Sequence, residues 1–225
     1  MGRGRLGVAL EHLLFWLVVR PLVLVVLGLN VRHRHHLPRQ GPAILAANHN
    51  SHLDTLVLMT LLPARLLHRA RPVAAADYFL ANRPVAWFSL NVLGILPVER
   101  RGQRSDPGAD PLASAREALD AGELVLLFPE GSRGDPERLA AFKSGLAHLA
   151  RSRPEVPVIP VFMHGLGKSL PRGSALPVPF FCDVFVGPPL YGGEATWGGD
   201  HRAFMAGYSD RMQELSREER LAEWS

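Results

Sequence analysis

Cysteine is nearly absent from this chain, because Cys182 is the only one among 225 residues. A single thiol excludes an intramolecular disulfide framework and a metal site built on paired cysteines, so a reducing compartment is the expected environment. Lysine is also scarce: only two of the 25 basic residues, Lys143 and Lys168, are lysines. Each of them is therefore a candidate for a specific role.

Long charged tracts, low-complexity segments and internal repeats are missing as well. The 25 basic residues exceed the 21 acidic ones, which gives a net charge of +4 and favours anionic surfaces. The stripe of basic residues typical of nucleic-acid-binding proteins is not present, so we predict no nucleic-acid partner. With 225 residues, 47% of them hydrophobic, the chain is long enough for one buried core and short for two.

The most apolar stretch of the chain lies near its beginning, at residues 13–29. Its 17 residues reach only the lower limit of about 17 to 25 for a membrane-spanning helix. Arg20 and Pro21 interrupt its middle with a charge and with a residue that kinks helices. A secretory signal peptide is not indicated, because no small-x-small cleavage site follows the apolar run.

Basic residues flank this apolar stretch, with Arg3 and Arg5 before it and the run R-H-R-H-H at residues 32–36 after it. A buried core helix, an interfacial or re-entrant helix pair and a spanning helix are all compatible with the pattern. The interfacial arrangement fits the basic flanks best. We therefore predict a membrane-associating helical segment at residues 1–36 and one domain at residues 37–225, at the cytoplasmic face of the cell membrane.

Beyond residue 37, short apolar runs alternate with longer amphipathic stretches, as in strands interleaved with helices. The predicted strands are residues 43–47, 72–75, 94–98, 124–128, 158–162 and 181–186. The predicted helices are residues 53–62, 78–91, 111–121, 139–151 and 200–219. The expected fold class is a single α/β domain with a mixed sheet flanked by helices. Pro160 favours an edge position or a bulge for its strand, because proline cannot donate to a ladder.

A histidine and an aspartate five residues apart follow the first predicted strand, in the sequence N-H-N-S-H-L-D at residues 48–54. A helix that begins near Leu53 places its positive N-terminal end beside His49, which favours the neutral ring. Asp54 can orient this ring and stabilise the charge that forms when His49 accepts a proton. The pair predicts a general base for an alcohol, although the same spacing also occurs at solvated helix starts.

Two more groups of polar residues fall at strand ends, where open α/β sheets gather ligand groups. Arg100 ends the run G-I-L-P-V-E-R, and its planar guanidinium suits a phosphate. Glu130 and Arg133 lie in the turn F-P-E-G-S-R, in which Gly131 allows the backbone to approach a substrate closely. An ordinary surface turn with an ion pair is the alternative for Glu130 and Arg133, and an ordinary surface arginine is the alternative for Arg100.

Other chemistries fit the sequence less well. A metal site of His49, His52 and Asp54 lacks a further His, Cys or carboxylate motif. A serine hydrolase needs G-x-S-x-G, and G-S-R-G at residues 131–134 does not have that spacing. The G-K-S run at residues 167–169 lacks the first glycine of a phosphate loop. We predict no bound metal and no cofactor.

Read together, these segments resemble the glycerolipid acyltransferase family, which includes the 1-acylglycerol-3-phosphate acyltransferases. Residues 48–54 match the family pattern N-H-x-S-x-x-D, and residues 94–100 resemble its block that ends in arginine. Residues 128–133 resemble its F-P-E-G-[ST]-R block, with Ser132 in the place usually held by threonine. The resemblance covers roughly residues 40–190.

Two shorter matches extend the resemblance. V-I-P-V at residues 158–161 is similar to a family strand, and Lys143 falls in the family's F-K-x-G run at residues 142–145. The resemblance therefore implies a role for one of only two lysines, and it marks residues 37–225 as an acyltransferase domain.

The resemblance implies transfer of a fatty acyl group from acyl-CoA or acyl carrier protein to the hydroxyl of a lysophospholipid, at a membrane lipid surface. Lysophosphatidic acid is the expected acceptor, His49 the general base and Asp54 its orienting acid. The implied substrate-binding residues are Arg100, Glu130, Gly131, Ser132, Arg133 and Lys143. Glycerol 3-phosphate or a lyso amino-acid lipid is an alternative acceptor, and a catalytically silent lipid-binding scaffold is the alternative to an enzyme.

Overall fold

The computed structural model describes residues 4–23, 28–51, 53–79, 82–99, 110–132, 134, 138–169 and 181–222. The strands are β1 (Leu29–Arg32), β2 (Ala43–Ala47), β3 (Ala70–Ala75), β4 (Leu96–Val98), β5 (Leu124–Leu127), β6 (Pro157–His164), β7 (Cys182–Val186) and β8 (Leu190–Tyr191). The α-helices are α1 (Arg5–Leu14), α2 (Asp54–Leu61), α3 (Ala64–Leu67), α4 (Ala76–Phe79), α5 (Arg83–Asn91), α6 (Ala113–Asp120), α7 (Gly145–Ser152), α8 (Leu166–Ser169) and α9 (His201–Ala222). Shorter turns are the π-helical η1 (Phe15–Val19) and the 3-10 helices η3 (Arg34–His36) and η4 (Ala195–Trp197).

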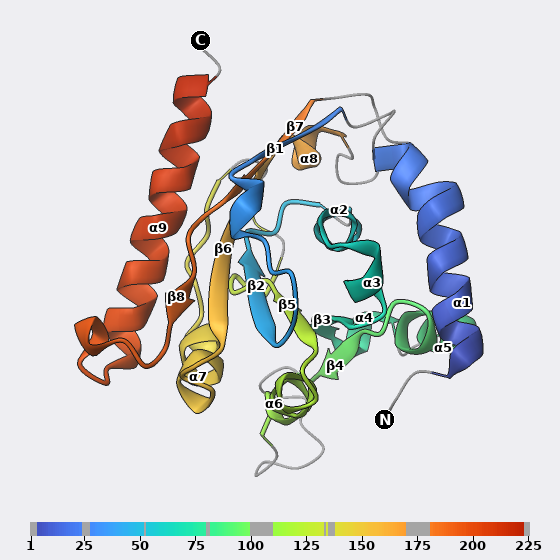
Figure 1. Ribbon diagram of the computed structural model, residues 1–225, viewed down its shortest axis with the longest axis horizontal. Helices are drawn as coiled ribbons and strands as arrows, with labels where there is room; N and C mark the ends of the chain where they lie inside the picture. The colour runs from blue at the N-terminus through green and yellow to red at the C-terminus, as the bar shows by residue number, and fades with distance from the viewer. Residues whose placement is uncertain are drawn as a thin grey trace.

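Helices cover both faces of a central sheet, in which the strand order is β1-β7-β6-β2-β5-β3-β4 and β8 pairs with β6 (Figure 1). Strand β6 runs antiparallel to β7 and β8, whereas the other neighbours run parallel. The mixed α/β fold with flanking helices that the sequence predicts is confirmed. Three parallel strands, β6, β2 and β5, form the middle of the sheet and end at the same edge.

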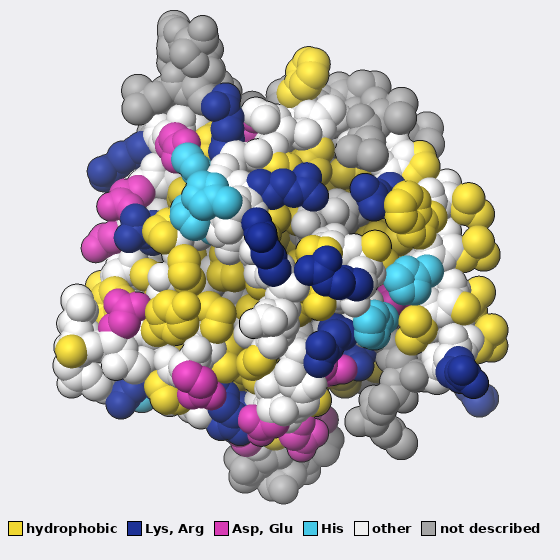
Figure 2. All heavy atoms as spheres, in the orientation of Figure 1, with side chains coloured by type: hydrophobic (Ala, Val, Ile, Leu, Met, Phe, Trp, Pro, Cys, Tyr) yellow, Lys and Arg dark blue, Asp and Glu magenta, His cyan; other side chains and the backbone are white. Residues whose placement is uncertain are grey.

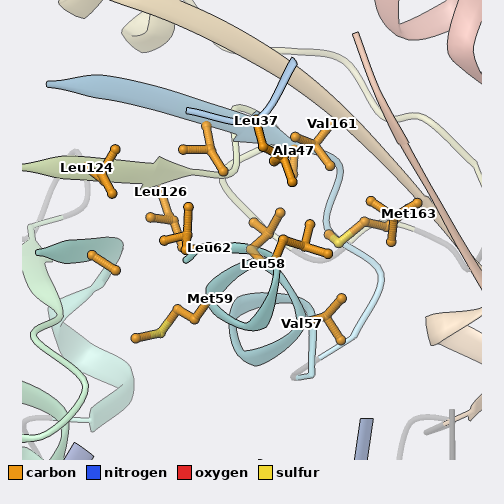
Figure 3. Packing of buried hydrophobic residues seen from close by; sticks show 14 of the residues in the cluster. Leu37, Ala47, Val57, Leu58, Met59, Leu62, Leu124, Leu126, Val161 and Met163 are labelled. Atoms are coloured by element: carbon orange, nitrogen blue, oxygen red, sulfur yellow. The ribbon is translucent and has the colours of Figure 1, made fainter. Parts of the chain in front are cut away.

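Strand β2 forms the centre of the core, and all five of its side chains are fully buried. Leu45 faces the cluster that contains the α2 side chains, while Ile44 faces the cluster built on α6, α7 and α9. This division follows from the alternation of side chains along a strand. Figure 3 shows the first cluster, in which Leu58 and Leu62 lie against residues of the central strands. A strand covered on both faces is apolar throughout, as the sequence of β2 is.

Pro160 corrects the edge position predicted for its strand. Strand β6 lies inside the sheet, between β2 and β7. The Pro160 carbonyl accepts a hydrogen bond from the N–H of Gly187 at 2.8 Å, so its nitrogen also faces the β7 side. The β7 ladder ends one residue away, at the Val161 and Val186 pair. Pro160 therefore lies where this ladder ends, and its missing N–H costs the sheet only a terminal hydrogen bond.

Three predicted boundaries also need correction. The helix predicted at residues 78–91 is divided into α4 and α5, and α5 begins at Arg83 with a proline in its first turn. The helix predicted at residues 139–151 begins only at Gly145, because the preceding residues run along the Glu130 turn. The segment predicted to be helical at residues 1–36 also contains an edge strand, β1, which begins at Leu29 and pairs with β7.

The N-terminal helical segment, formed by α1 and η1, is buried on one side and exposed on the other. Phe15 and Val19 belong to the core cluster beneath α2. Gly7 lies against the carbonyl oxygen of Asn91, which brings α1 onto α5. Leu17 on the opposite side is 67% exposed. Among the residues with described placement, no helix combines the length and apolar character that crossing a membrane requires.

Candidate active site

The loop after β2 is held to β6 by asparagine side chains. The Oδ1 of Asn48 accepts a hydrogen bond from the N–H of Met163 at 2.7 Å, and its Nδ2 donates to the Met163 carbonyl at 2.9 Å. The Nδ2 of Asn50 donates to the same carbonyl at 3.1 Å. These contacts continue the strand pairing beyond the end of β2. They fix the backbone on both sides of His49.

His49 and Asp54 form the hydrogen-bonded pair that their spacing predicts. The Nδ1 of His49 lies 2.8 Å from the Oδ2 of Asp54, the first residue of α2. The same oxygen accepts hydrogen bonds from the backbone N–H groups of Asn50 at 2.6 Å and Ser51 at 2.8 Å. Asp54 therefore holds the loop and the imidazole at once, at the positive end of α2.

Burial of Asp54 sets the electrostatics of this pair. Its carboxyl is fully buried, which raises its pKa above the ordinary value, and the hydrogen bonds from His49, Ser51 and Asn50 offset part of that rise. We assign the Nδ1 proton to His49 as the donor to Asp54, which leaves Nε2 with a lone pair. The His49 side chain is 21% exposed, so a substrate can reach it.

Phe128 joins the loop that carries His49 to the turn F-P-E-G-S-R. Its ring stacks on the His49 imidazole, with 4.3 Å between the ring centroids and 22° between the planes. The N–H of Gly134 donates to the His49 carbonyl at 3.1 Å. The segment N-H-N-S-H-L-D and the turn F-P-E-G-S-R, about eighty residues apart along the chain, are therefore in direct contact.

Glu130 lies in the same place and is almost completely buried. Burial raises its pKa to about 7, while the backbone N–H groups of His49 and Ala140 and the electrostatic interaction with the His49 ring lower it in part. Within the described part of the chain, neither carboxylate oxygen has a partner in full hydrogen-bonding geometry. Near neutral pH this carboxyl exists in both protonation states, beside the histidine.

The turn after β5 brings Lys143 to this site. The N–H of Gly131 donates to the Phe128 carbonyl at 3.0 Å, and the N–H of Lys143 donates to the Pro129 carbonyl at 2.8 Å. Gly131 has a φ of +72°, and a side chain there would come within 2.8 Å of the Lys143 Cε. The turn thus requires glycine for two reasons, its left-handed backbone and the lysine that crosses it.

The structure brings together five of the predicted site residues: His49, Asp54, Glu130, Gly131 and Lys143. Ser132 is exposed beside them on the same turn. Arg100, Arg133 and His52 fall outside the described residues, so their predicted roles stay predictions. In the part of the chain that the structure describes, no three His, Cys, Asp or Glu side chains are placed to hold a metal ion.

Sequence reasoning missed several supporting residues. Phe128 begins a block in which only the four residues from Glu130 to Arg133 were predicted to bind substrate, yet its ring stacks on His49. Met163 carries no sequence signal, because it acts through its backbone. Tyr208 lies in a helix that reads as polar, but it is fully buried and close enough to the Glu130 carboxylate for that charge to raise its own pKa. The only sequence signal for Phe128 was its place as the first residue of the family's F-P-E-G-[ST]-R block.

Residues 28–164 match a protein-family model described as Acyltransferase. The chain belongs to the glycerolipid acyltransferase family. Over 147 residues, the chain is 31% identical to the chloroplastic 1-acyl-sn-glycerol-3-phosphate acyltransferase LPAT1 of Arabidopsis thaliana. This match covers 65% of this chain and 38% of LPAT1. It is 29% identical over 190 residues to the mouse 1-acyl-sn-glycerol-3-phosphate acyltransferase alpha, covering 84% of this chain and 63% of that protein.

A solved structure supports the same fold for this family member. The 1-acyl-sn-glycerophosphate (LPA) acyltransferase PlsC of Thermotoga maritima superposes with a TM-score of 0.70 at 18% identity, covering 93% of this chain and 78% of that one. At this identity the likeness concerns the fold. The match to the plant relative spans about two fifths of its length, and the match to the mouse relative less than two thirds.

Proposed function

We propose that this chain transfers a fatty acyl group from a thioester to the hydroxyl of a lysophospholipid, with lysophosphatidic acid as acceptor and phosphatidic acid as product. The observation that carries the proposal is the His49 and Asp54 pair, held at the end of a central strand beside Glu130. Relatives whose names specify 1-acyl-sn-glycerol-3-phosphate as substrate support the choice of acceptor.

The proposed reaction needs one base and a pocket that excludes competing nucleophiles. The Nε2 of His49 accepts the proton of the acceptor hydroxyl, and the oxygen attacks the thioester carbonyl carbon. A C–O bond forms, the C–S bond breaks, and the proton taken by His49 passes to the departing thiolate. Asp54 stabilises the imidazolium between these steps. Acyl-CoA and acyl carrier protein both supply such a thioester.

Binding of the acceptor phosphate is proposed for the cationic residues near the Gly131 turn. Lys143 crosses this turn and is exposed, so its ammonium can meet a phosphate that arrives from solvent. Arg100 and Arg133 remain candidates from the family resemblance. The buried Glu130 can accept or donate a hydrogen bond near neutral pH, because its pKa is about 7.

We further propose that the chain associates with the cytoplasmic face of the cell membrane, through the segment 1–36 that precedes the acyltransferase domain 37–225. Support comes from the N-terminal apolar surface, a set of exposed side chains on α1, η1 and α5: Leu13, Trp16, Leu17, Val18, Trp87 and Phe88. All of these residues except Trp16 also line a groove of about 330 Å³ between the two helical segments. Exposed apolar patches of this kind mark lipid or protein contacts.

His49→Ala tests the catalytic proposal. Loss of a general base lowers the rate of acyl transfer by about 10² to 10⁴. Free-thiol release from acyl-CoA in the presence of lysophosphatidic acid measures this rate, and mass spectrometry of the lipid identifies the product. Acyl carrier protein as donor and glycerol 3-phosphate as acceptor are run in parallel.

Thermal unfolding of His49→Ala is the control, because the ring is partly exposed and its loss should leave the fold intact. A folded variant that retains the wild-type rate would remove His49 from the mechanism. Wild-type protein that binds lysophospholipid but releases no thiol with either donor would favour the scaffold alternative instead.

Leu17→Asn tests the membrane proposal. Loss of one apolar side chain from the N-terminal apolar surface is expected to weaken partition onto vesicles by about an order of magnitude. Tyr191→Asn is the control, because Tyr191 is exposed on β8, on the other side of the molecule from α1 (Figure 1). Sedimentation with phosphatidylcholine vesicles measures both, and equal partition of the two variants would contradict the proposed surface.

A further inference from the structure

A small pocket of about 80 Å³ lies between the N-terminal helical segment, β1 and the end of α2. Its apolar walls include Val31 and Leu61. Arg20, Arg34 and Thr60 also line the pocket. The pocket therefore combines an apolar wall with two positive charges in a space that suits a small polar group.

The two arginines are available to an anion from outside the chain. Within the described residues, neither Arg20 nor Arg34 is paired with a carboxylate. Arg20 lies instead over the ring of Trp16, with 4.6 Å from its Cζ to the ring centroid, and Arg34 is exposed. Guanidinium groups bind phosphate oxygens in a fork-like geometry, which makes phosphate the natural ligand of such a pair.

The pocket is separate from the candidate active site. Asp54 begins α2, whereas Thr60 and Leu61 lie at its other end, about 9 Å farther along the helix axis. No residue of the candidate site lines the pocket. In a lysophospholipid the phosphate and the free hydroxyl are only a few bonds apart. A lipid whose phosphate occupies this pocket is therefore not the one that reacts at His49.

The position of the pocket indicates a membrane source for this phosphate. Arg20 stacks on Trp16, which is 54% exposed within the N-terminal apolar surface. On the face that Figure 2 draws, basic side chains gather in the middle, while acidic side chains lie mostly along its left and lower margins. An anionic group with acyl chains attached satisfies both the arginines and the apolar surface next to them.

We infer that this pocket binds the phosphate of an anionic membrane phospholipid that is not a substrate. The inference rests on the proposed membrane association and adds to it a specific headgroup site. The bound lipid would orient the chain so that the N-terminal apolar surface meets the bilayer.

Partition onto vesicles tests the pocket, with full-length protein and with phosphatidylcholine vesicles that contain or lack phosphatidylglycerol. Arg20→Gln and Arg34→Gln are each expected to lower partition onto the anionic vesicles about fivefold, and to leave partition onto neutral vesicles unchanged. Arg34→Lys keeps the charge but loses the paired N–H donors of the guanidinium. Its partition onto the anionic vesicles should therefore fall measurably, though less than that of Arg34→Gln.

Arg32→Gln is the matched control. It removes the same charge two residues from Arg34, but alternation along β1 directs Arg32 away from the side on which Leu29 and Val31 line the pocket. Its partition is expected to change less than that of Arg34→Gln. Thermal unfolding confirms that all variants are folded.

Several results would overturn the inference. Equal losses in Arg32→Gln and Arg34→Gln, or full binding by Arg34→Lys, would leave only general electrostatic attraction. Displacement by inorganic phosphate, at an ionic strength matched with chloride, would assign the pocket to a free anion. Wild-type protein that binds neutral vesicles but gains nothing from phosphatidylglycerol would remove the pocket alone, and wild-type protein that binds neither would remove the membrane proposal as well.

Discussion

At the scale of single residues, the candidate site depends on carboxyl groups that burial makes difficult to ionise. One carboxylate oxygen of Asp54 accepts hydrogen bonds from the His49 ring and from two backbone N–H groups, and these bonds offset part of the cost of burying its charge. Glu130 has no comparable set of donors among the described residues, and its pKa rises to about 7. The site thus retains one buried carboxyl whose charge is costly.

The raised pKa of Glu130 predicts how stability changes with pH. Because the folded protein holds this proton up to about pH 7 and the unfolded chain only up to about 4.5, the free energy of unfolding falls as pH rises between these values. The fall due to Glu130 is about 3 kcal/mol. Glu130→Gln removes it, so the variant should be more stable than wild type at pH 8.

Urea unfolding at a series of pH values measures this difference. Gln keeps the shape of the side chain and cannot ionise, which makes the comparison with wild type a direct one. Curves for the two proteins that run parallel between pH 4.5 and 8 would show that the Glu130 carboxyl is solvated in solution.

At the scale of elements, the turn after β5 is more constrained than its sequence suggests. Gly131 combines a left-handed backbone with a contact to Lys143. Gly131→Ala is expected to destabilise the protein by about 1 to 2 kcal/mol, the cost of a left-handed residue with a Cβ.

Gly145→Ala is the control for this prediction. Gly145 begins α7, its φ is not in the left-handed region, and a Cβ there meets no atom within 4 Å. Alanine should therefore leave stability unchanged or raise it by up to about 1 kcal/mol. Urea denaturation of both variants gives the comparison, and a Gly131 variant as stable as the Gly145 variant would disprove the constraint.

Elements also differ in how far their sequences predict them. The bounds of β2 match the prediction from its apolar run, because both faces of the strand are covered. The helix expected at residues 139–151 begins six residues late, since Lys143 hydrogen-bonds to the turn at Pro129 before α7 can start. A local pattern cannot reveal a competitor that lies in another element.

At the scale of the whole molecule, two cores lie on opposite faces of the sheet. The C-terminal helix α9 closes one of them through Phe204, Tyr208 and Met212, all fully buried. Phe204→Ala should destabilise the protein by about 3 to 5 kcal/mol. Phe181→Ala, at a site that is 81% exposed, should change stability by less than about 0.5 kcal/mol.

Thermal and urea unfolding of these two variants compare the same substitution inside and outside the core. Similar small effects would mean that α9 is not part of the cooperative unit. The candidate site would then lose the support of Tyr208, which lies near Glu130 from this helix.

The sequence by itself determined the α/β class, the central strand and the pairing of His49 with Asp54, since these depend on periodicity and on groups five residues apart. Tertiary structure alone decided that Pro160 lies inside the sheet and that Lys143 crosses the Gly131 turn. It also decided which side of the N-terminal helical segment is buried. Such features depend on which distant surfaces meet, and burial, not neighbouring residues, sets their energies.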